Sequence, residues 1–121
     1  MSENVPIPEA PVDGPVTMIN AFTVPAQEAE LFLRLWKNNA AAMAALPGFI
    51  RTRMYRSVIS DAELGFITHA EWNSGKALQQ ARTDLTWRVS MRRMMDDPEL
   101  HVTPRPGVYE VALDVKSSDR P

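Results

Sequence analysis

The sequence contains no cysteine and only two histidines, and these absences restrict the chemistry that it can support. Without cysteine the chain has no disulfide, no thiolate nucleophile and no cysteine-ligated metal. His69 and His101 lie far apart, and neither belongs to an HxxxH or HxxE pattern of metal ligands. Glycine-rich phosphate loops and the GxSxG nucleophile motif are also missing. We therefore expect no metal, and no cofactor bound by a recognisable motif.

Long apolar runs and an excess of one charge are absent as well. The formal net charge is -2, so nothing indicates the basic surface that binds nucleic acid. No segment approaches the roughly 18 apolar residues of a membrane span, and the N-terminus lacks the basic-then-apolar order of a secretion signal. We expect a cytoplasmic protein that binds neither nucleic acid nor membrane. Its 121 residues, 45% of them hydrophobic, predict one globular domain.

Proline is concentrated at the N-terminus, where residues 1–15 hold four of the ten prolines (Pro6, Pro8, Pro11 and Pro15). Such a segment forms neither a helix nor a paired strand, so we expect an extended arm that is either disordered or lies across a partner subunit. Residues 16–115 form the predicted domain. Residues 116–121 are a polar tail.

Hydrophobic periodicity within residues 16–115 predicts the order β-α-β-β-α-β. Alternating side chains predict strands at 16–24, 49–58, 65–72 and 107–115. Apolar residues spaced by three and four predict helices at 25–46 and 74–95. Pro47-Gly48 ends the first helix, and Asp84 could cap a new segment where the second breaks. This order predicts an α+β ferredoxin-like fold, an antiparallel sheet with two helices on one face.

The two faces of that sheet are predicted to differ. Right-handed crossovers place the first and third strands at its centre. Two helices cover one face only, whereas the alternation puts Ile19, Ile67, Leu113 and Val115 on the other. A second copy of the sheet is the simplest cover for an apolar face, so we predict a homodimer.

On the helix-covered face, the alternation places Asn20 on the first strand and Thr68 and Trp72 on the third. A buried amide and an indole N–H both need hydrogen-bond partners. Large side chains could wall this space, namely Phe22, Trp36, Met43, Trp87 and Met91. Together these residues predict a pocket for an aromatic ligand with a few oxygens. The alternative is that Asn20 bonds the backbone and the Trp and Met residues only fill the core.

His69 falls on the opposite face of the third strand and is expected to contact solvent or the dimer partner. The alternative is proton exchange with Glu71, two residues further along the same face.

Three stretches resemble the antibiotic biosynthesis monooxygenase family, whose small ferredoxin-like members dimerise into an α+β barrel. They are VTMINAFTVP (16–25), LPGFIRTRMYRSV (46–58) and FITHAEWNSGKALQQA (66–81), and the resemblance extends over 16–115. It implies oxygenation of polycyclic aromatic polyketides by molecular oxygen, often without metal or flavin, in a pocket between helices and sheet. It also implies that Asn20 and Trp72 are catalytic, and we expect Thr68 to be an auxiliary donor.

The sequence departs from the family pattern at Thr68, where some family oxygenases have a second Asn. A hydroxyl donates one hydrogen bond and lacks the donor pair of an amide. The haem-degrading branch uses an axial His on the second helix, and no His lies between Trp72 and His101. LHVTPRPGVYEV, NAFTVP and HAEWNSG are most similar to the branch that opens the B ring of angucycline-type polyketides. That similarity implies reduced flavin supplied by a partner flavin reductase.

The first hypothesis is therefore a homodimeric oxygenase of antibiotic biosynthesis, which forms a quinone or opens a ring in an aromatic polyketide. One alternative is a dimer of the same fold that binds an aromatic metabolite without oxidising it. Another is a polyketide cyclase or dehydratase that uses His69 or His101.

Overall fold

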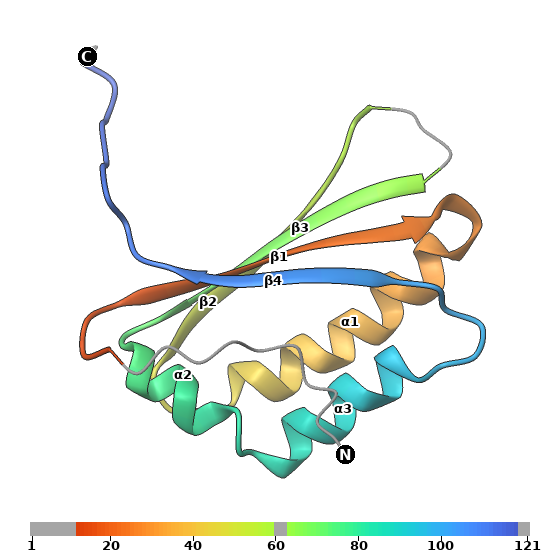
Figure 1. The fold of residues 1–121 in the computed structure, drawn as a ribbon, viewed down its shortest axis with the longest axis horizontal. Helices are drawn as coiled ribbons and strands as arrows, with labels where there is room; N and C mark the ends of the chain where they lie inside the picture. The colour runs from red at the N-terminus through yellow and green to blue at the C-terminus, as the bar shows by residue number, and fades with distance from the viewer. Residues whose placement is uncertain (1–11, 60–62, 119–121) are drawn as a thin grey trace.

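The computed structural model describes residues 12–59 and 63–118, in which three helices cover one face of a four-stranded sheet (Figure 1). The elements are β1 (Val16–Pro25), the 3-10 turn η1 (Ala26–Glu28), α1 (Ala29–Ala44), β2 (Phe49–Arg56), β3 (Glu63–Trp72), α2 (Gly75–Ala81), α3 (Leu85–Met95) and β4 (Thr103–Tyr109). This order confirms the ferredoxin-like prediction. Residues 1–11 of the predicted arm lie outside the described residues. In the part that is described, no helix is long and apolar enough to cross a membrane.

The sheet has the strand order β2-β3-β1-β4, which confirms that β1 and β3 are central. All neighbouring strands are antiparallel, and the consecutive strands β2 and β3 pair with each other. Across β1 and β3, Asn20 pairs with Thr68 and Val16 pairs with Trp72. This register determines where the polar residues of the two central strands lie relative to each other.

Side-chain caps account for the predicted break in the second helical region. Ser74 Oγ accepts a hydrogen bond from the backbone N–H of Ala77, and Asp84 Oδ2 accepts one from that of Trp87, both at 2.9 Å. Each cap binds an N–H that has no partner within its own helix, so each can start a separate helix. The second predicted helix is therefore two helices, α2 and α3.

The turn after α1 requires glycine for two reasons. Gly48 has a φ of 85°, a conformation that other residues rarely adopt. A Cβ at this position would also lie 2.5 Å from the Cβ of Ala77 on α2. The Pro47-Gly48 pair thus ends α1 and also lets β2 start close to α2.

The last strand lies earlier in the chain than predicted, because β4 spans Thr103–Tyr109 and not 107–115. Pro104 and Pro106, which argue against a strand locally, lie within it. The backbone N–H of Arg105 points to Asn20 on β1. Successive N–H groups point to opposite sides of a strand, so the N–H groups that Pro104 and Pro106 lack would point to the open edge of the sheet. No partner strand needs them there.

Pairing with β1 ends at Tyr109, opposite Thr17, because β1 itself begins one residue before Thr17. Residues 110–118 extend away from the sheet (Figure 1), and their side chains are exposed. Leu113 and Val115 are 83% and 80% exposed, so their predicted place on the second face of the sheet is wrong.

The core lies between the sheet and the helices. Phe32 of α1 packs on Phe22 and Phe66, with ring centroids 5.1 and 5.0 Å apart. At the other end, Trp72 packs between Phe49 and Trp87, at 5.4 and 5.9 Å. The predicted inward faces of β1 and β3 are buried along their length, which confirms the phase of both strands.

Candidate functional site

The centre of the sheet presents two buried polar side chains to the helices, Asn20 and Thr68. They are direct cross-strand neighbours, so their Cβ atoms are about 5 Å apart. Asn20 Oδ1 accepts a hydrogen bond of 2.9 Å from the backbone N–H of Arg105. The alternative interpretation was that Asn20 bonds the backbone, and its side-chain oxygen does so. The other polar group of Asn20 is its NH₂ donor.

Trp72 ends β3 completely buried, and its indole Nε1 makes no hydrogen bond. The indole Nε1 of Trp87, in the adjacent ring, is also buried without a partner. A buried donor without an acceptor costs about 1–3 kcal/mol, and most such groups in folded proteins are satisfied. Two of them in neighbouring rings indicate a place where an acceptor from a ligand would be stabilised.

Asn20 and Trp72 share the interior, as predicted, but they do not meet at one point. Trp72 lies opposite Val16, four residues along β1 from Asn20. At about 3.3 Å per residue, the two side chains start roughly 13 Å apart. They can therefore bind two ends of a long ligand, and they cannot bind one oxygen atom together.

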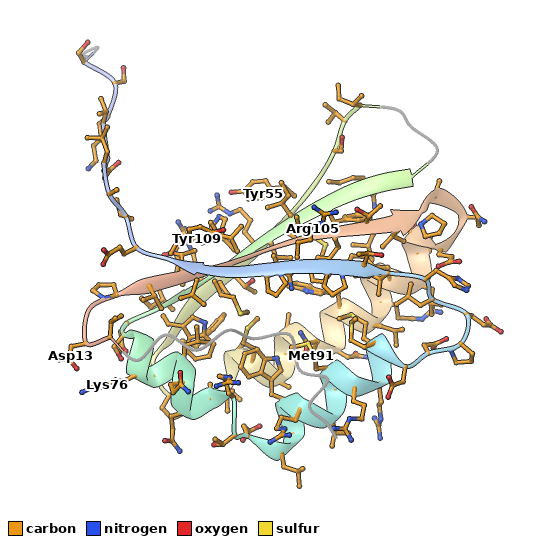
Figure 2. All side chains as sticks on the ribbon, viewed as in Figure 1. Asp13, Tyr55, Lys76, Met91, Arg105 and Tyr109 are labelled. Atoms are coloured by element: carbon orange, nitrogen blue, oxygen red, sulfur yellow. The ribbon has the colours of Figure 1, made fainter. Side chains whose placement is uncertain are left out.

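The predicted wall residues all pack in the same layer. Met43, Trp87 and Met91 are buried, and Trp36 is partly buried against the core. Figure 2 shows Met91 in the layer between α3 and the sheet. Since Trp72 and Met43 are 0% and 1% exposed, a ligand can enter only if the helix-side residues move. Methionine side chains, with three rotatable bonds, are suited to such movement.

Sequence reasoning missed one buried polar residue of this layer, Asn39 on α1. It is 3% exposed, and its Oδ1 has no hydrogen-bond partner. The signal was present in the helical spacing, because Asn39 interrupts the apolar stripe formed by Phe32, Trp36 and Met43.

The opposite face of the sheet carries His69, as predicted. Tyr55 Oη lies 3.0 Å from His69 Nε2, and His69 Nδ1 lies 3.7 Å from Glu71 Oε2. Glu71 also accepts a hydrogen bond of 3.1 Å from Arg51 Nε. The sheet separates this network from Asn20 and Trp72, so His69 cannot act on a ligand in the interior.

His101 lies at a third place and contacts Glu28. Its backbone N–H donates to Glu28 Oε1 at 2.6 Å, and its Nδ1 lies 2.7 Å from Glu28 Oε2. The pKa of Glu28 is lowered, first by that backbone N–H and then by the His101 ring, against an opposing effect of burial. The contact holds the α3–β4 connection against η1. His101, like His69, therefore lies away from the predicted site.

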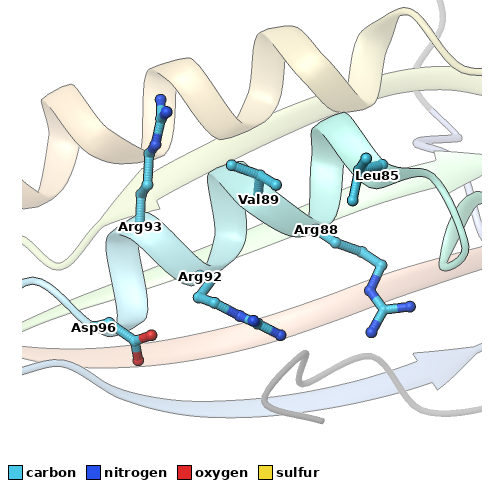
Figure 3. A pocket seen from close by; sticks show the side chains of 6 residues that line it. All are labelled: Leu85, Arg88, Val89, Arg92, Arg93 and Asp96. Carbon is cyan, nitrogen blue, oxygen red and sulfur yellow. The ribbon is translucent and has the colours of Figure 1, made fainter.

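Other surfaces offer no stronger site. Across residues 12–59 and 63–118, no cluster of three or more His, Cys, Asp or Glu side chains could hold a metal ion. A groove runs along the outer side of α3 (Figure 3), lined by Leu85, Arg88, Val89, Arg92, Arg93 and Asp96. A second depression is lined by Leu46, Pro47, Gly48, Asn73, Ala77, Gln80, Ala81, Thr83 and Asp84. None of the predicted site residues lines either.

Comparison with known proteins identifies relatives of this fold. A family model described as antibiotic biosynthesis monooxygenase matches residues 15–92. SnoaB from Streptomyces nogalater, described as a cofactor-independent oxygenase, is 23% identical with a TM-score of 0.71, over 86% of this chain and 99% of its own. A candidate monooxygenase from Shewanella loihica PV-4 is 28% identical with a TM-score of 0.66, over 84% and 98%. Curated protein sequences give no match.

A third solved structure of the same fold holds a large planar ligand. It is a mutant of MhuD with two manganese protoporphyrin IX molecules per active site, 24% identical with a TM-score of 0.64, over 84% of this chain and 99% of its own. Helices α2 and α3 of the present chain contain no histidine.

Proposed function

The chain belongs to the antibiotic biosynthesis monooxygenase family, and on this basis we propose that it is a homodimeric oxygenase that oxidises a polycyclic aromatic polyketide with molecular oxygen. The observation that carries the proposal is the buried indole N–H of Trp72, which has no partner in a layer otherwise walled by aromatic and methionine side chains. An electron-rich fused-ring substrate with oxygen substituents fits this combination of apolar walls and few polar groups.

For quinone formation, the substrate is an anthrone-type ring system with a CH₂ group. Loss of one C–H proton to water gives an anion delocalised onto the ring oxygen. This anion transfers one electron to O₂, and the resulting radical and superoxide combine into a C–O bond. After the peroxide is protonated, loss of water leaves a carbonyl group. One oxygen atom enters the product and the other enters water, so no outside reductant is needed.

The residues of the interior have separate tasks in this reaction. The NH₂ group of Asn20 and the hydroxyl of Thr68 donate to the oxygen that carries the anion's charge, because they are neighbours at the sheet centre. The side chain of Trp72 starts roughly 13 Å along the strand from that of Asn20, and its N–H binds an oxygen at the far end of the substrate. Once the proton has left, burial by the helices excludes water from the reacting anion.

Ring opening by insertion of one oxygen atom differs in its electron balance. The second oxygen atom leaves as water, and this requires two electrons and two protons from outside. Reduced flavin delivered by a partner reductase can supply them. The requirement for reduced flavin therefore distinguishes ring opening from quinone formation.

The helix-free face of the sheet is the proposed dimer interface. Ile67, Tyr55 and Tyr109 are 48%, 45% and 55% exposed on three different strands. Figure 2 shows Tyr55 and Tyr109 on the side of the sheet away from the helices. Light scattering after size-exclusion chromatography tests this proposal, and we expect twice the mass of the chain at micromolar concentration.

Oxygen uptake with a dihydroxyanthrone tests the proposed reaction, after subtraction of the enzyme-free rate. We expect one O₂ consumed per anthrone converted to anthraquinone without flavin, or uptake only with reduced flavin if the reaction is ring opening. A rise in melting temperature without oxygen uptake would instead support a non-oxidising binding protein. Conversion of a polyketide without oxygen, with a pH dependence abolished by His69→Ala or His101→Ala, would support a cyclase or dehydratase.

A further inference from the structure

The position of Asn39 within the interior follows from the packing of α1. Phe32 of α1 lies on the Phe22–Phe66 pair of the sheet. Asn39 is seven residues further along the helix, which corresponds to about 10 Å at 1.5 Å per residue. In a strand, about 10 Å corresponds to three residues. Asn39 is therefore expected about three strand positions beyond the Phe22–Phe66 pair, in the direction in which α1 runs.

The direction of α1 places Asn39 over the polar centre of the sheet. The helix starts near the end of β1 and leads into Phe49, which lies opposite Trp72. Moving along α1 thus means moving from Phe22 towards Trp72. Three strand positions lead past the Asn20–Thr68 pair and stop short of Trp72. Asn39 is therefore level with the space between the sheet donors and the indole.

The buried polar side chains of the described residues are Asn20, Asn39 and Thr68, and the rise of α1 places Asn39 close to the level of the other two. Ordinary packing would favour apolar residues at these positions, because a buried polar group without a partner lowers stability. Asn39 Oδ1 has no partner at all. A buried carboxamide oxygen without a partner, at about the level of two other polar side chains, indicates that a polar group of a ligand fits between them.

We propose that Asn39 is a substrate-binding residue whose carboxamide hydrogen-bonds a hydroxyl group of the fused-ring substrate from the helix side. The inference rests on the proposed oxygenase function and specifies its substrate class further. The NH₂ of Asn20 and the hydroxyl of Thr68 can donate to an oxygen anion, whereas Asn39 Oδ1 can accept from a neutral phenol. The substrate is then a polyhydroxylated ring system with a free hydroxyl on the edge that faces α1.

The test compares two adjacent asparagines on the same helix, since Asn38 is exposed whereas Asn39 is buried. The variants are Asn39→Leu and Asn39→Ala, with Asn38→Leu as the control for helix propensity. One measurement is the melting temperature without ligand. The other is the Kd of a dihydroxyanthraquinone and of its dimethyl ether, followed by quenching of tryptophan fluorescence in each full-length variant.

We expect Asn39→Leu to melt no lower than Asn38→Leu, because it removes an unmet polar atom. The dihydroxyanthraquinone should bind about tenfold more weakly to Asn39→Leu, whereas Asn38→Leu should stay within twofold of the wild type. The wild type should prefer the free hydroxyls over the methyl ether by about tenfold, and both Asn39 variants should lose that preference. A merely structural Asn39 would not change this preference.

The inference is overturned if the folded Asn39 variants keep the Kd and the preference for hydroxyls of the wild type, whatever their melting temperature. If they also melt several degrees lower, Asn39 serves the fold. A different result identifies failure of the proposed function. If the wild-type protein neither binds the dihydroxyanthraquinone nor consumes oxygen with the anthrone, the oxygenase proposal is wrong, and the inference about Asn39 is wrong with it.

Discussion

The two faces of the sheet differ in whether their polar groups are hydrogen-bonded. On the helix-covered face, the indole N–H groups of Trp72 and Trp87 and the amide oxygen of Asn39 have no partners. On the open face, polar side chains bond one another in a network of Arg51, Glu71, His69, Tyr55 and Arg53. Unmet groups reduce stability and can be satisfied by a ligand, whereas met groups serve the structure. Polar changes inside should therefore affect turnover, and polar changes outside should not.

The largest effect is expected on the open face if a second copy covers it. Ile67 lies on central strand β3, so Ile67→Arg would place an unpaired charge within the interface and weaken association by several kcal/mol. The variant should elute as a folded monomer in light-scattering chromatography. Val58→Arg is the matched control, because Val58 is 95% exposed beyond the end of β2. An unchanged dimer for Ile67→Arg would locate the interface elsewhere.

On the covered face, Trp72→Phe tests the unmet indole directly. The change keeps an aromatic ring and removes the N–H that orients the far end of the substrate, so we expect kcat for anthrone oxidation to fall about a hundredfold. Tyr55→Phe removes one polar atom from the open face and should leave kcat within about twofold, because its partner His69 lies across the sheet from the interior. Equal kcat values for Trp72→Phe and the wild type would show that the N–H has no catalytic role.

Asn20 has an oxygen that bonds the backbone and an NH₂ donor that we assign to the substrate. Asn20→Ala should therefore affect stability and turnover together. Loss of the acceptor for Arg105 N–H should lower the free energy of unfolding by about 1–2 kcal/mol, measured by urea denaturation. Because Thr68 still donates to the same oxygen, loss of the NH₂ donor should lower kcat by only about tenfold. Thr68→Val keeps the shape of the side chain and removes one hydroxyl, and it should cause a smaller decrease in kcat. An unfolding midpoint of Asn20→Ala equal to that of the wild type would contradict the stabilising role of the Arg105 contact.

The smallest effect is expected at the satisfied Glu28–His101 contact. Because the pKa of Glu28 is lowered in the folded protein, its stabilisation is complete above the unfolded value of about 4.3. It is lost as the pH falls through the lowered folded pKa. The stability difference between wild type and Glu28→Gln should therefore be present at pH 7 and should vanish in acid, as measured by thermal melts.

Two further observations would decide the role of that contact. His101→Ala keeps the backbone N–H, which lowers the pKa of Glu28 most, so it should retain part of the pH-dependent stabilisation. Glu28→Gln should leave kcat at pH 7 unchanged. A large loss of turnover would show that this satisfied contact also serves the reaction.

The sequence predicted most of the fold because several local signals agree in each element. Alternation, the Pro47-Gly48 stop and the cap at Asp84 all point to the observed strands and helices. The last strand was misplaced because Pro104 and Pro106 argue against a strand when judged locally. Their tolerance depends on the edge position of β4, and that position is a property of the whole sheet.

The candidate site was predicted in composition but not in geometry. Periodicity placed Asn20, Thr68 and Trp72 on one buried face, because side-chain direction in a strand depends only on position along it. The same reasoning passed over Asn39, since a single asparagine in a helix is usually exposed. Its burial results from the packing of α1 on the sheet.

By itself, the sequence determined which residues of β1 and β3 share a face, because side-chain direction in a strand depends on local order. Only the tertiary structure decided which polar atoms are satisfied. The bond between Arg105 and Asn20 joins residues 85 positions apart, and the unmet groups of Trp72 and Asn39 come from different elements. Hydrogen-bond satisfaction depends on such distant neighbours, and they leave no trace in a local pattern.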